Sequence, residues 1–278
     1  MPLIAMTREM GSLGKDVAAA LADKSGRKVV YHEIIDPLAD KMRLRKSHVE
    51  RFLDGRAGVW ERLTTDKTSL AIFTADEIFR FLRDGDTVVI RGWGASHLLR
   101  GIPHVIRVRV CAPLETRVER MMERLATDQR ETIETEIAMN EESHSAITKR
   151  NFGINWREPE HYDLVLSTER LSVGECVDEL ECAMRQQRFQ ETRESMRAVE
   201  NQALSWSVRA ALRRDERTKD THISVECDEG GAKLLGVVRS PAEVLAAEEV
   251  AAIVAGVKSV DNLLKSTMDA VSRFRREG

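Results

Sequence analysis

A glycine-rich segment near the start of the chain contains the residues best suited to phosphate chemistry. It follows a short apolar run and precedes a stretch whose apolar residues recur at helical spacing. Glycines at such a turn let backbone N–H groups converge on an anion, the helix start adds partial positive charge, and a lysine reaches the terminal phosphates. The segment therefore predicts a phosphate-binding loop. Its predicted nucleotide-binding residues are Gly11, Ser12, Leu13, Gly14, Lys15 and Asp16.

This loop departs from the usual pattern G-x-x-x-x-G-K-[ST] at two positions. Glu9 stands where that pattern has glycine, and Asp16 stands where it has a hydroxyl residue. An ordinary tight turn between a strand and a helix that happens to contain Gly-Lys is the alternative interpretation. Magnesium keeps several waters and binds through one or two carboxylates, so we expect Asp16 to be a direct or indirect ligand of an ion held mainly by phosphates.

Three arginines further along fit a site for phosphoryl transfer, in which catalysis is mostly positioning and neutralisation of charge. Arg117, Arg120 and Arg124 recur at i, i+3 and i+7, so they form a stripe along one helix. Together with Lys15 they are the predicted catalytic residues. The alternative is that these arginines simply lie on a solvated helix face.

The overall composition limits which classes of protein and which partners are expected. The chain has 278 residues, a length that favours about two domains. Its formal net charge of -3 shows no basic excess, so we expect no nucleic-acid partner. Apolar runs fall far short of the roughly 20 residues that cross a bilayer, and a strand pattern begins at once. The cysteines form no Cys-x-x-Cys pair, which favours reduced thiols. These features predict a cytoplasmic protein.

Strand and helix patterns alternate over the first two-thirds of the chain. This alternation predicts an α/β fold, a parallel sheet with helices on both faces. The expected strands span residues 3–6, 28–31, 87–90, 104–111 and 162–167. The expected helices follow the glycine turn, span residues 33–52 and 66–83, begin at Pro113 and span residues 173–184. The apolar face expected for the helix at Pro113 consists of Leu114, Val118, Met121, Met122 and Leu125.

The pattern changes after Met184. A polar stretch that begins at residues 186–190 predicts a linker helix, which we count with the second domain. The order expected beyond it is helix, strand, strand, helix, strand, which makes a small α+β module. Its elements are expected at residues 198–214, 223–227, 233–239, 241–255 and 257–264, with a hairpin turn at Gly230-Gly231. We therefore expect two domains, at residues 1–190 and 191–278.

With these elements in place, residues 1 to about 190 resemble the cytidylate kinase-like family, a branch of the nucleoside monophosphate kinases. The matching stretches are residues 7–15, 31–35, 92–95, 112–118 and 162–167. The resemblance implies a phosphate-loop kinase fold, magnesium ATP as donor and CMP or a dCMP-like nucleotide as acceptor. It also implies that Gly11, Ser12, Gly14 and Lys15 hold the ATP phosphates, that Glu33 lies beside the acceptor pocket and that Arg117 lies where the lid begins.

The chain departs from the family pattern on the acceptor side. Tyr31-His32 stands where the family usually has Asp-Arg, Trp93 stands where it has arginine, and His144 takes the place of a lid arginine. Two interpretations of Trp93 stay open, stacking on a base and packing in the core; Arg91 is the candidate replacement for the lost arginine. The predicted acceptor-binding residues are His32, Glu33, Arg91, Trp93, His144, Lys149 and Arg150. Because lost phosphate contacts lower the expected rate, a catalytically weak or inactive nucleotide-binding regulatory module is the alternative to a kinase.

Residues from about 198 to 278 resemble a BON domain. The match rests on residues 210–212, 223–225, 232–238, 250–254 and 256–263. BON domains are small αβ modules associated with phospholipid surfaces, other ligands and assembly, so the resemblance implies a phospholipid surface or a protein partner. The basic residues of the tail are too few for stable surface attachment. Assembly into a homo-oligomer, and a structural role in which the loop is vestigial, also stay open.

Overall fold

The computed structural model describes residues 2–31, 33–53, 66–92 and 94–268, and its chain divides into two compact units. The first comprises Met1–Thr65 and Asp84–Ser195, and the second comprises Asp66–Arg83 and Met196–Gly278. A segment from the middle of the sequence thus belongs with the C-terminal unit. The domain boundary between residues 190 and 191 stays a prediction.

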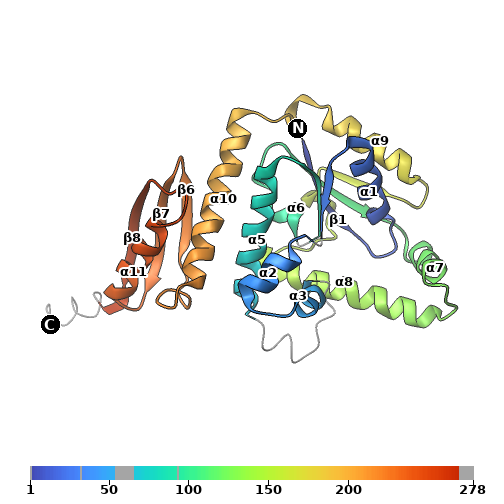
Figure 1. The fold of residues 1–278 in the computed structure, drawn as a ribbon. Coiled ribbons are helices and arrows are strands. Elements are labelled where there is room, and N and C mark those ends of the chain that lie inside the picture. Colours follow the sequence, from blue (N-terminus) through green and yellow to red (C-terminus); the bar gives the residue numbers. More distant parts are fainter. Residues whose placement is uncertain (1, 32, 54–65, 93, 269–278) are drawn as a thin grey trace. The chain divides into compact units, whose positions relative to one another are not determined.

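A five-stranded parallel sheet forms the centre of the first unit, which confirms the predicted α/β class (Figure 1). The strand order is β2-β3-β1-β4-β5. The strands are β1 (Leu3–Arg8), β2 (Lys28–Val30), β3 (Thr87–Arg91), β4 (Val105–Cys111) and β5 (Leu164–Ser167). The central strand, β1, is buried from Leu3 to Thr7, as expected for a strand covered on both faces. Because parallel strands end at the same edge, the loop after β1 lies where ligands bind in open α/β sheets.

Helices cover both faces of this sheet. On one face, α1 (Gly14–Ser25) packs against α9 (Val173–Met184) over Ile4 and Met6 of β1. Thr7 alternates to the other face, where its hydroxyl lies 3.0 Å from the hydroxyl of Ser96 in α6 (Ala95–Leu98). By the same alternation, Arg8 shares the face of Ile4 and Met6, on which α1 lies.

Two further helices hold the loop after β1. α7 (Leu114–Leu125) and α8 (Arg130–Phe152) share an apolar cluster with Met10 of that loop. The sequence did not indicate α8, because few of its 23 residues are apolar and its two buried isoleucines, Ile133 and Ile137, carry the contact. The expected apolar face of α7 is wrong at its ends: Leu114 and Leu125 are half exposed, whereas Arg117 is buried.

Two expected helices are also corrected. The single helix expected over residues 33–52 is two helices, α2 (Ile35–Met42) and α3 (Lys46–Leu53), because Arg43 adopts a left-handed conformation that ends α2. The expected linker helix, predicted to begin at residue 186, begins only at Arg193. Only Gln187–Phe189 forms one 3-10 turn, and the side chain of Gln190 donates to the carbonyl of Met184 at the end of α9.

The second unit is an α+β module on a mixed sheet, as predicted for the C-terminal region. β6 (Ser224–Asp228) pairs antiparallel with β7 (Gly231–Val238) across the predicted hairpin turn, and β7 pairs parallel with β8 (Ser259–Ser266). α10 (Arg193–Arg214), which begins five residues before the expected Ala198, and α11 (Pro241–Ala252) supply the rest of the core. That core contains Val208, Leu212, Val225, Leu234, Ala247, Val250 and Ala251.

The helix predicted at residues 66–83 is α5 (Lys67–Asp84), and it belongs to this second unit. Arg213 of α10 donates to Oδ2 of Asp66 at 2.6 Å and to Oγ of Ser69 at 2.7 Å. Nearer the start of α10, the hydroxyl of Ser207 donates a hydrogen bond to Oδ1 of Asp76 at 2.9 Å. These contacts fasten α5 to α10. Among the described helices, none combines the length and apolar content needed to cross a membrane.

We expect Arg213→Ala to lower the free energy of unfolding by about 1–3 kcal/mol, because its charge-assisted hydrogen bonds to α5 are partly buried. Denaturant unfolding of the full chain measures this loss. Arg217→Ala is the matched control: Arg217 is 53% exposed and also pairs with two carboxylates, so its removal should cost less than about 1 kcal/mol. Equal losses in the two variants would contradict the fastening role of Arg213.

Candidate functional site

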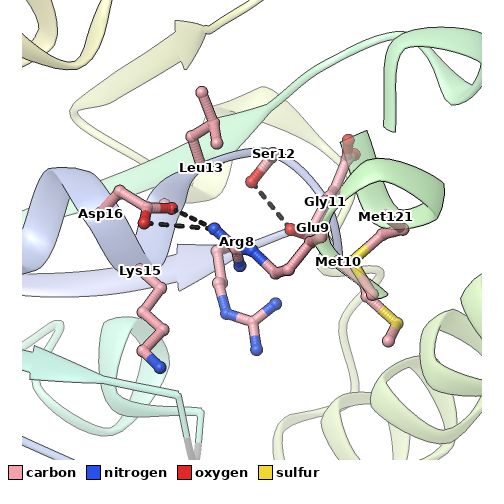
Figure 2. A pocket seen from close by; sticks show the side chains of 11 residues that line it. Arg8, Glu9, Met10, Gly11, Ser12, Leu13, Lys15, Asp16 and Met121 are labelled. Atoms are coloured by element: carbon pink, nitrogen blue, oxygen red, sulfur yellow. Dashed lines mark hydrogen bonds and ion pairs between the residues drawn. The ribbon is translucent and has the colours of Figure 1, made fainter. Parts of the chain in front are cut away.

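The loop between β1 and α1 has the backbone geometry of an anion cradle (Figure 2). Gly11 and Leu13 have φ angles of 81° and 57°, in the left-handed region. The hydroxyl of Ser12 donates to the carbonyl of Glu9 at 2.7 Å and closes the turn. Among the described residues, the amides of Gly11, Leu13, Gly14 and Lys15 donate no hydrogen bond within the protein. These free N–H groups and the start of α1 together favour a bound anion.

A pocket lies over this cradle. Lys15 is exposed and, within the described part of the chain, forms no ion pair. At the wall, Asp16 accepts from Arg124 at 3.0 Å. The pocket is lined by Arg8, Glu9, Met10, Gly11, Ser12, Leu13, Gly14, Lys15, Asp16, Met121 and Arg124. All six residues predicted for nucleotide binding therefore gather at one pocket.

Close neighbours leave no room for a side chain at either loop glycine. A Cβ on Gly11 would lie 2.7 Å from the backbone oxygen of Arg117, and a Cβ on Gly14 would lie 2.7 Å from Cβ of Arg8. Separations this short do not occur between real atoms, so a larger residue would displace the loop. The sequence indicated these glycines for phosphate access, and the structure adds a packing reason.

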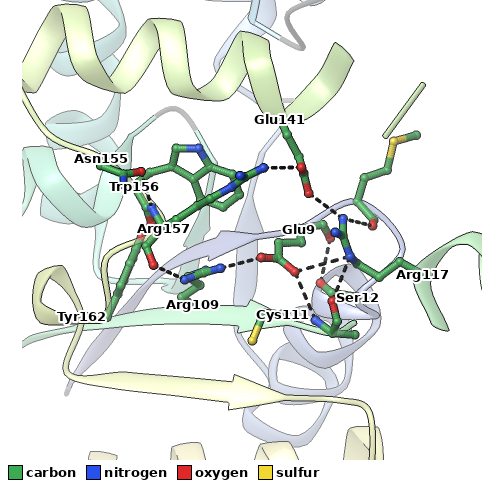
Figure 3. Close-up of polar contacts among 12 residues, drawn as sticks. Glu9, Ser12, Arg109, Cys111, Arg117, Glu141, Asn155, Trp156, Arg157 and Tyr162 are labelled. Atoms are coloured by element: carbon green, nitrogen blue, oxygen red, sulfur yellow. Dashed lines mark hydrogen bonds and ion pairs between the residues drawn. The ribbon is translucent and has the colours of Figure 1, made fainter. Parts of the chain in front are cut away.

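Glu9 explains the first departure from the usual loop pattern (Figure 3). Its carboxylate points away from the cradle, is buried, and accepts from Arg109 at 2.5 Å and from the amide of Ala112 at 3.2 Å. Nε of Arg117 lies 3.5 Å from the same carboxylate. Because a buried carboxylate is costly unless it is paired, these contacts tie the loop to β4 and to α7.

The predicted arginine stripe serves two different purposes. Arg117 is buried, pairs with Glu141 of α8 at 2.7 Å and donates to the carbonyl of Ala112 at 2.9 Å, so its guanidinium is used inside the protein. Arg120 donates to the hydroxyl of Thr168 at 3.0 Å, and that hydroxyl donates to the carbonyl of Ser12 at 2.8 Å. Of the three arginines, Arg124 alone lines the pocket.

The structure describes only some of the residues predicted to bind the acceptor. His32 and Trp93 lie outside the described residues. Glu33 accepts a hydrogen bond from the amide of Tyr31 at 2.6 Å. Arg91 is buried, and its guanidinium lies 3.7 Å from the centre of the Tyr31 ring. This cation–π contact holds the end of β3 against the loop after β2.

The remaining predicted residues lie on the C-terminal half of α8. His144 stacks on the ring of Trp156 with their centres 4.4 Å apart, and Lys149 and Arg150 are exposed. None of these three lines the pocket described above. The structure therefore does not bring them together with Lys15, and their acceptor role stays a prediction.

Burial keeps two histidines of this region neutral. It lowers the pKa of His97 from its ordinary value of 6.5 to about 4, with further lowering by His161, Arg107 and Arg100. It likewise lowers the pKa of His144 to about 4, with contributions from His97, Arg8 and Arg109. Both side chains are therefore uncharged near pH 7 and contribute no positive charge to a phosphate site.

The sequence did not single out four residues that shape the site: Arg8, Glu9 as an anchor, Arg109 and Thr168. Arg8 carried a detectable signal, because a charged residue ends an otherwise apolar strand immediately before the glycine turn. Arg109 and Thr168 act through contacts to residues 100 or more positions away. No local pattern reveals such contacts.

The parallel sheet order, the loop after β1 and the lysine at the start of α1 define a phosphate-loop kinase-like domain, followed by a BON-like α+β region. The family model described as "Cytidylate kinase-like family" matches residues 3–170, and the BON domain model matches residues 201–268. The chain belongs to the cytidylate kinase-like family and carries a C-terminal BON domain.

Individual relatives are distant. A cytidylate kinase from Methanosarcina acetivorans is 28% identical over 99 residues, which cover 36% of this chain and 55% of that protein. An uncharacterized protein from Eubacterium ventriosum has a similar structure, with a TM-score of 0.52, 19% identity, and coverage of 66% of this chain and 98% of the other. A shikimate kinase from Acinetobacter baumannii gives a TM-score of 0.40 at 13% identity over 66% of this chain and 93% of that one.

We expect Gly11→Ala to destabilise the protein more than Gly26→Ala does. Both glycines have positive φ angles, so both alanines pay a strain of about 1–2 kcal/mol, but only at Gly11 would the new Cβ meet a backbone atom, since nothing lies within 4 Å of Gly26. Denaturant unfolding and nucleotide binding measure the two effects. Nucleotide affinity should fall in Gly11→Ala alone; equal behaviour of both variants would refute the close contact with Arg117.

The lowered pKa values of His97 and His144 predict that stability depends on pH in a specific way. Since the folded pKa of His97 and of His144 is about 4 and the ordinary value is 6.5, the unfolded state binds more protons between these values. The free energy of unfolding should therefore fall as the pH drops from 6.5 toward 4, by up to about 3 kcal/mol for the buried His97 and by less for the partly exposed His144.

Urea unfolding between pH 7.5 and pH 4.5 measures this slope. His97→Gln should flatten it, whereas His222→Gln, at an exposed position of the second unit, should leave it unchanged. A wild-type stability that is constant from pH 6.5 to 5 contradicts the burial of neutral histidines.

Proposed function

We propose that the first domain is an ATP-dependent kinase that transfers the terminal phosphoryl group of magnesium ATP to a nucleoside monophosphate, CMP or a dCMP-like acceptor. One observation carries this proposal: amides of the loop after β1 and the ammonium group of Lys15, none of which has a partner among the described residues, line the same pocket. Such an arrangement suits the phosphates of a nucleotide. Membership of the cytidylate kinase-like family supports the choice of acceptor.

Each residue of the pocket has a role that follows from its position. The amides at the start of α1 hold the inner phosphates, and Lys15 reaches the terminal one. Arg124 at the rim is 46% exposed, so it can turn from Asp16 to a phosphate at a cost of about 0–1 kcal/mol. No covalent bond to the protein is needed, because positioning and charge neutralisation dominate this chemistry.

Magnesium fits the pocket through Asp16. Its carboxylate lines the pocket, and the exposed ion pair with Arg124 is readily exchanged. Asp16 would hold the ion, directly or through water, and magnesium would supply positive charge against the charge that develops on the phosphates. With one carboxylate available, the ion would keep several waters, which is its usual preference.

A regulatory nucleotide-binding module is the second candidate function. Two observations favour it: the guanidinium of Arg117 is used in internal ion pairs, and the carboxylate of Glu33 accepts from the backbone of its own loop. In this scheme nucleotide binding controls what the BON domain contacts, either a phospholipid surface or a protein partner. We also propose a cytoplasmic location for either function, in keeping with the reduced cysteines.

A coupled assay of ADP release with a panel of nucleoside monophosphates tests the kinase. We expect acceptor-dependent turnover that is fastest with CMP or dCMP, and a loss of about 10²–10³-fold in kcat for Lys15→Met, because one donor to the developing charge is removed. Lys28→Met removes an exposed lysine that pairs only with Asp86 among the described residues, and it should retain full activity.

The outcomes separate the candidate functions. Tight ATP binding by calorimetry without turnover on any acceptor supports the regulatory module. Binding of neither ATP nor CMP at millimolar concentration removes both functions.

A further inference from the structure

Arg8 is held beside the phosphate loop by its own packing. It is the last residue of β1, it alternates to the α1 face of the sheet, and it is partly buried. Its stem runs against Gly14, where a Cβ would come within 2.7 Å of Cβ and 3.5 Å of Cδ of Arg8. The absence of a side chain at Gly14 therefore makes room for this arginine. A stem confined in this way has already lost much of its rotamer freedom, which lowers the entropy cost of binding through the guanidinium.

The guanidinium of Arg8 differs from the other arginines around the loop. Arg109, Arg117 and Arg124 each pair with a carboxylate. Arg8 lines the pocket together with Lys15 and, in the part of the chain that the structure describes, forms no hydrogen bond or ion pair. Figure 2 shows both side chains extending toward the same open side of the loop.

The positive charge of Arg8 also acts on a nearby histidine. After burial and His97, the charge of Arg8 contributes to the low pKa of His144, about 4. His144 is thereby kept neutral and does not compete with Arg8 for an anion. The carboxylate nearest in sequence, Glu9, faces away and is already bound by Arg109 and Ala112. Among the described residues, the pocket thus presents two cations without an ion-pair partner, Arg8 and Lys15, while Asp16 is paired with Arg124.

We propose that Arg8 binds the terminal phosphate of the nucleotide opposite Lys15 and neutralises the phosphoryl group during transfer. This inference rests on the proposed function and adds a substrate-contacting residue to it. A guanidinium presents planar paired donors that match phosphate oxygens, whereas an ammonium group acts as a point charge. Lys15 and Arg8 together therefore grip the terminal phosphate from the helix side and from the strand side of the loop.

The chemical step needs no proton from Arg8. The bond between the terminal phosphorus and the bridging oxygen of the donor breaks, and its electron pair leaves on ADP. A phosphate oxygen of the acceptor supplies the electron pair of the new bond. The negative charge on the three remaining oxygens of the transferred group is what Arg8 and Lys15 neutralise.

Calorimetry on the full chain tests the role of Arg8, with a non-hydrolysable magnesium ATP analogue, magnesium ADP and inorganic tripolyphosphate as probes. Arg8→Met removes the charge but keeps a long stem against Gly14. We expect it to lose about tenfold or more in affinity for the ATP analogue and for tripolyphosphate, and about threefold or less for ADP, which lacks the terminal phosphate. Arg8→Lys should lie between Arg8→Met and the wild type.

Arg100→Met is the matched control. Arg100 is exposed in the first unit and does not line the pocket, so the variant removes the same charge and should bind all three probes like the wild type. Thermal unfolding without ligand checks the fold of each variant. If Arg8→Met does not fold, Arg8→Gln replaces it with the same expected losses.

Each outcome decides between the two proposals. If the wild type binds nucleotide and Arg8→Met binds the ATP analogue within about twofold of it, Arg8 has no phosphate role and the kinase proposal stands. If the wild type binds tripolyphosphate but no nucleotide, and Arg8→Met loses that binding, the kinase proposal fails and the phosphate role of Arg8 stands. If the wild type binds none of the probes, both are overturned.

Discussion

The buried carboxylate of Glu9 is the interaction on which the phosphate loop depends. It accepts from Arg109 of β4 and from the amide of Ala112, and it lies beside Arg117 of α7. Breaking a buried pair by removing one partner typically costs about 3–5 kcal/mol, because the other charge is left uncompensated, so Glu9 and its arginines depend on one another. The departure from the usual loop pattern thus adds side-chain contacts that join the loop to β4 and α7.

The charge balance around the loop follows from this anchor. Two largely buried arginines beside the loop are matched by carboxylates, Arg109 by Glu9 and Arg117 by Glu141, because uncompensated charges are unfavourable away from water. Lys15 and Arg8, which have no ion-pair partner among the described residues, line the pocket. The same network therefore does two things: it holds the cradle in shape, and it leaves the pocket positive and able to attract a polyanion.

The sequence predicted those features of the fold and site that depend on local patterns. Strand-to-helix alternation gave the parallel sheet, and Gly11 to Lys15 marked the loop, because both signals lie within a few residues. It did not predict features that depend on contacts between residues far apart in the chain. The arginine periodicity of α7 was correct, but whether Arg117 faces water or Glu141 depends on α8, a helix with too few apolar residues to be recognised. Likewise Thr168 reaches Ser12 across 156 positions.

The position of α5 in the sequence differs from its place in the fold. The family model spans residues 3–170 and so includes α5, yet α5 belongs to the compact unit that contains the BON domain. It is held there by Arg213 and Ser207 of α10. At its far end the chain passes directly through Gly85 and Asp86 into β3, whose last residue, Arg91, contacts Tyr31. The C-terminal unit is therefore not continuous in sequence, because α10 holds a helix that comes from the middle of the chain.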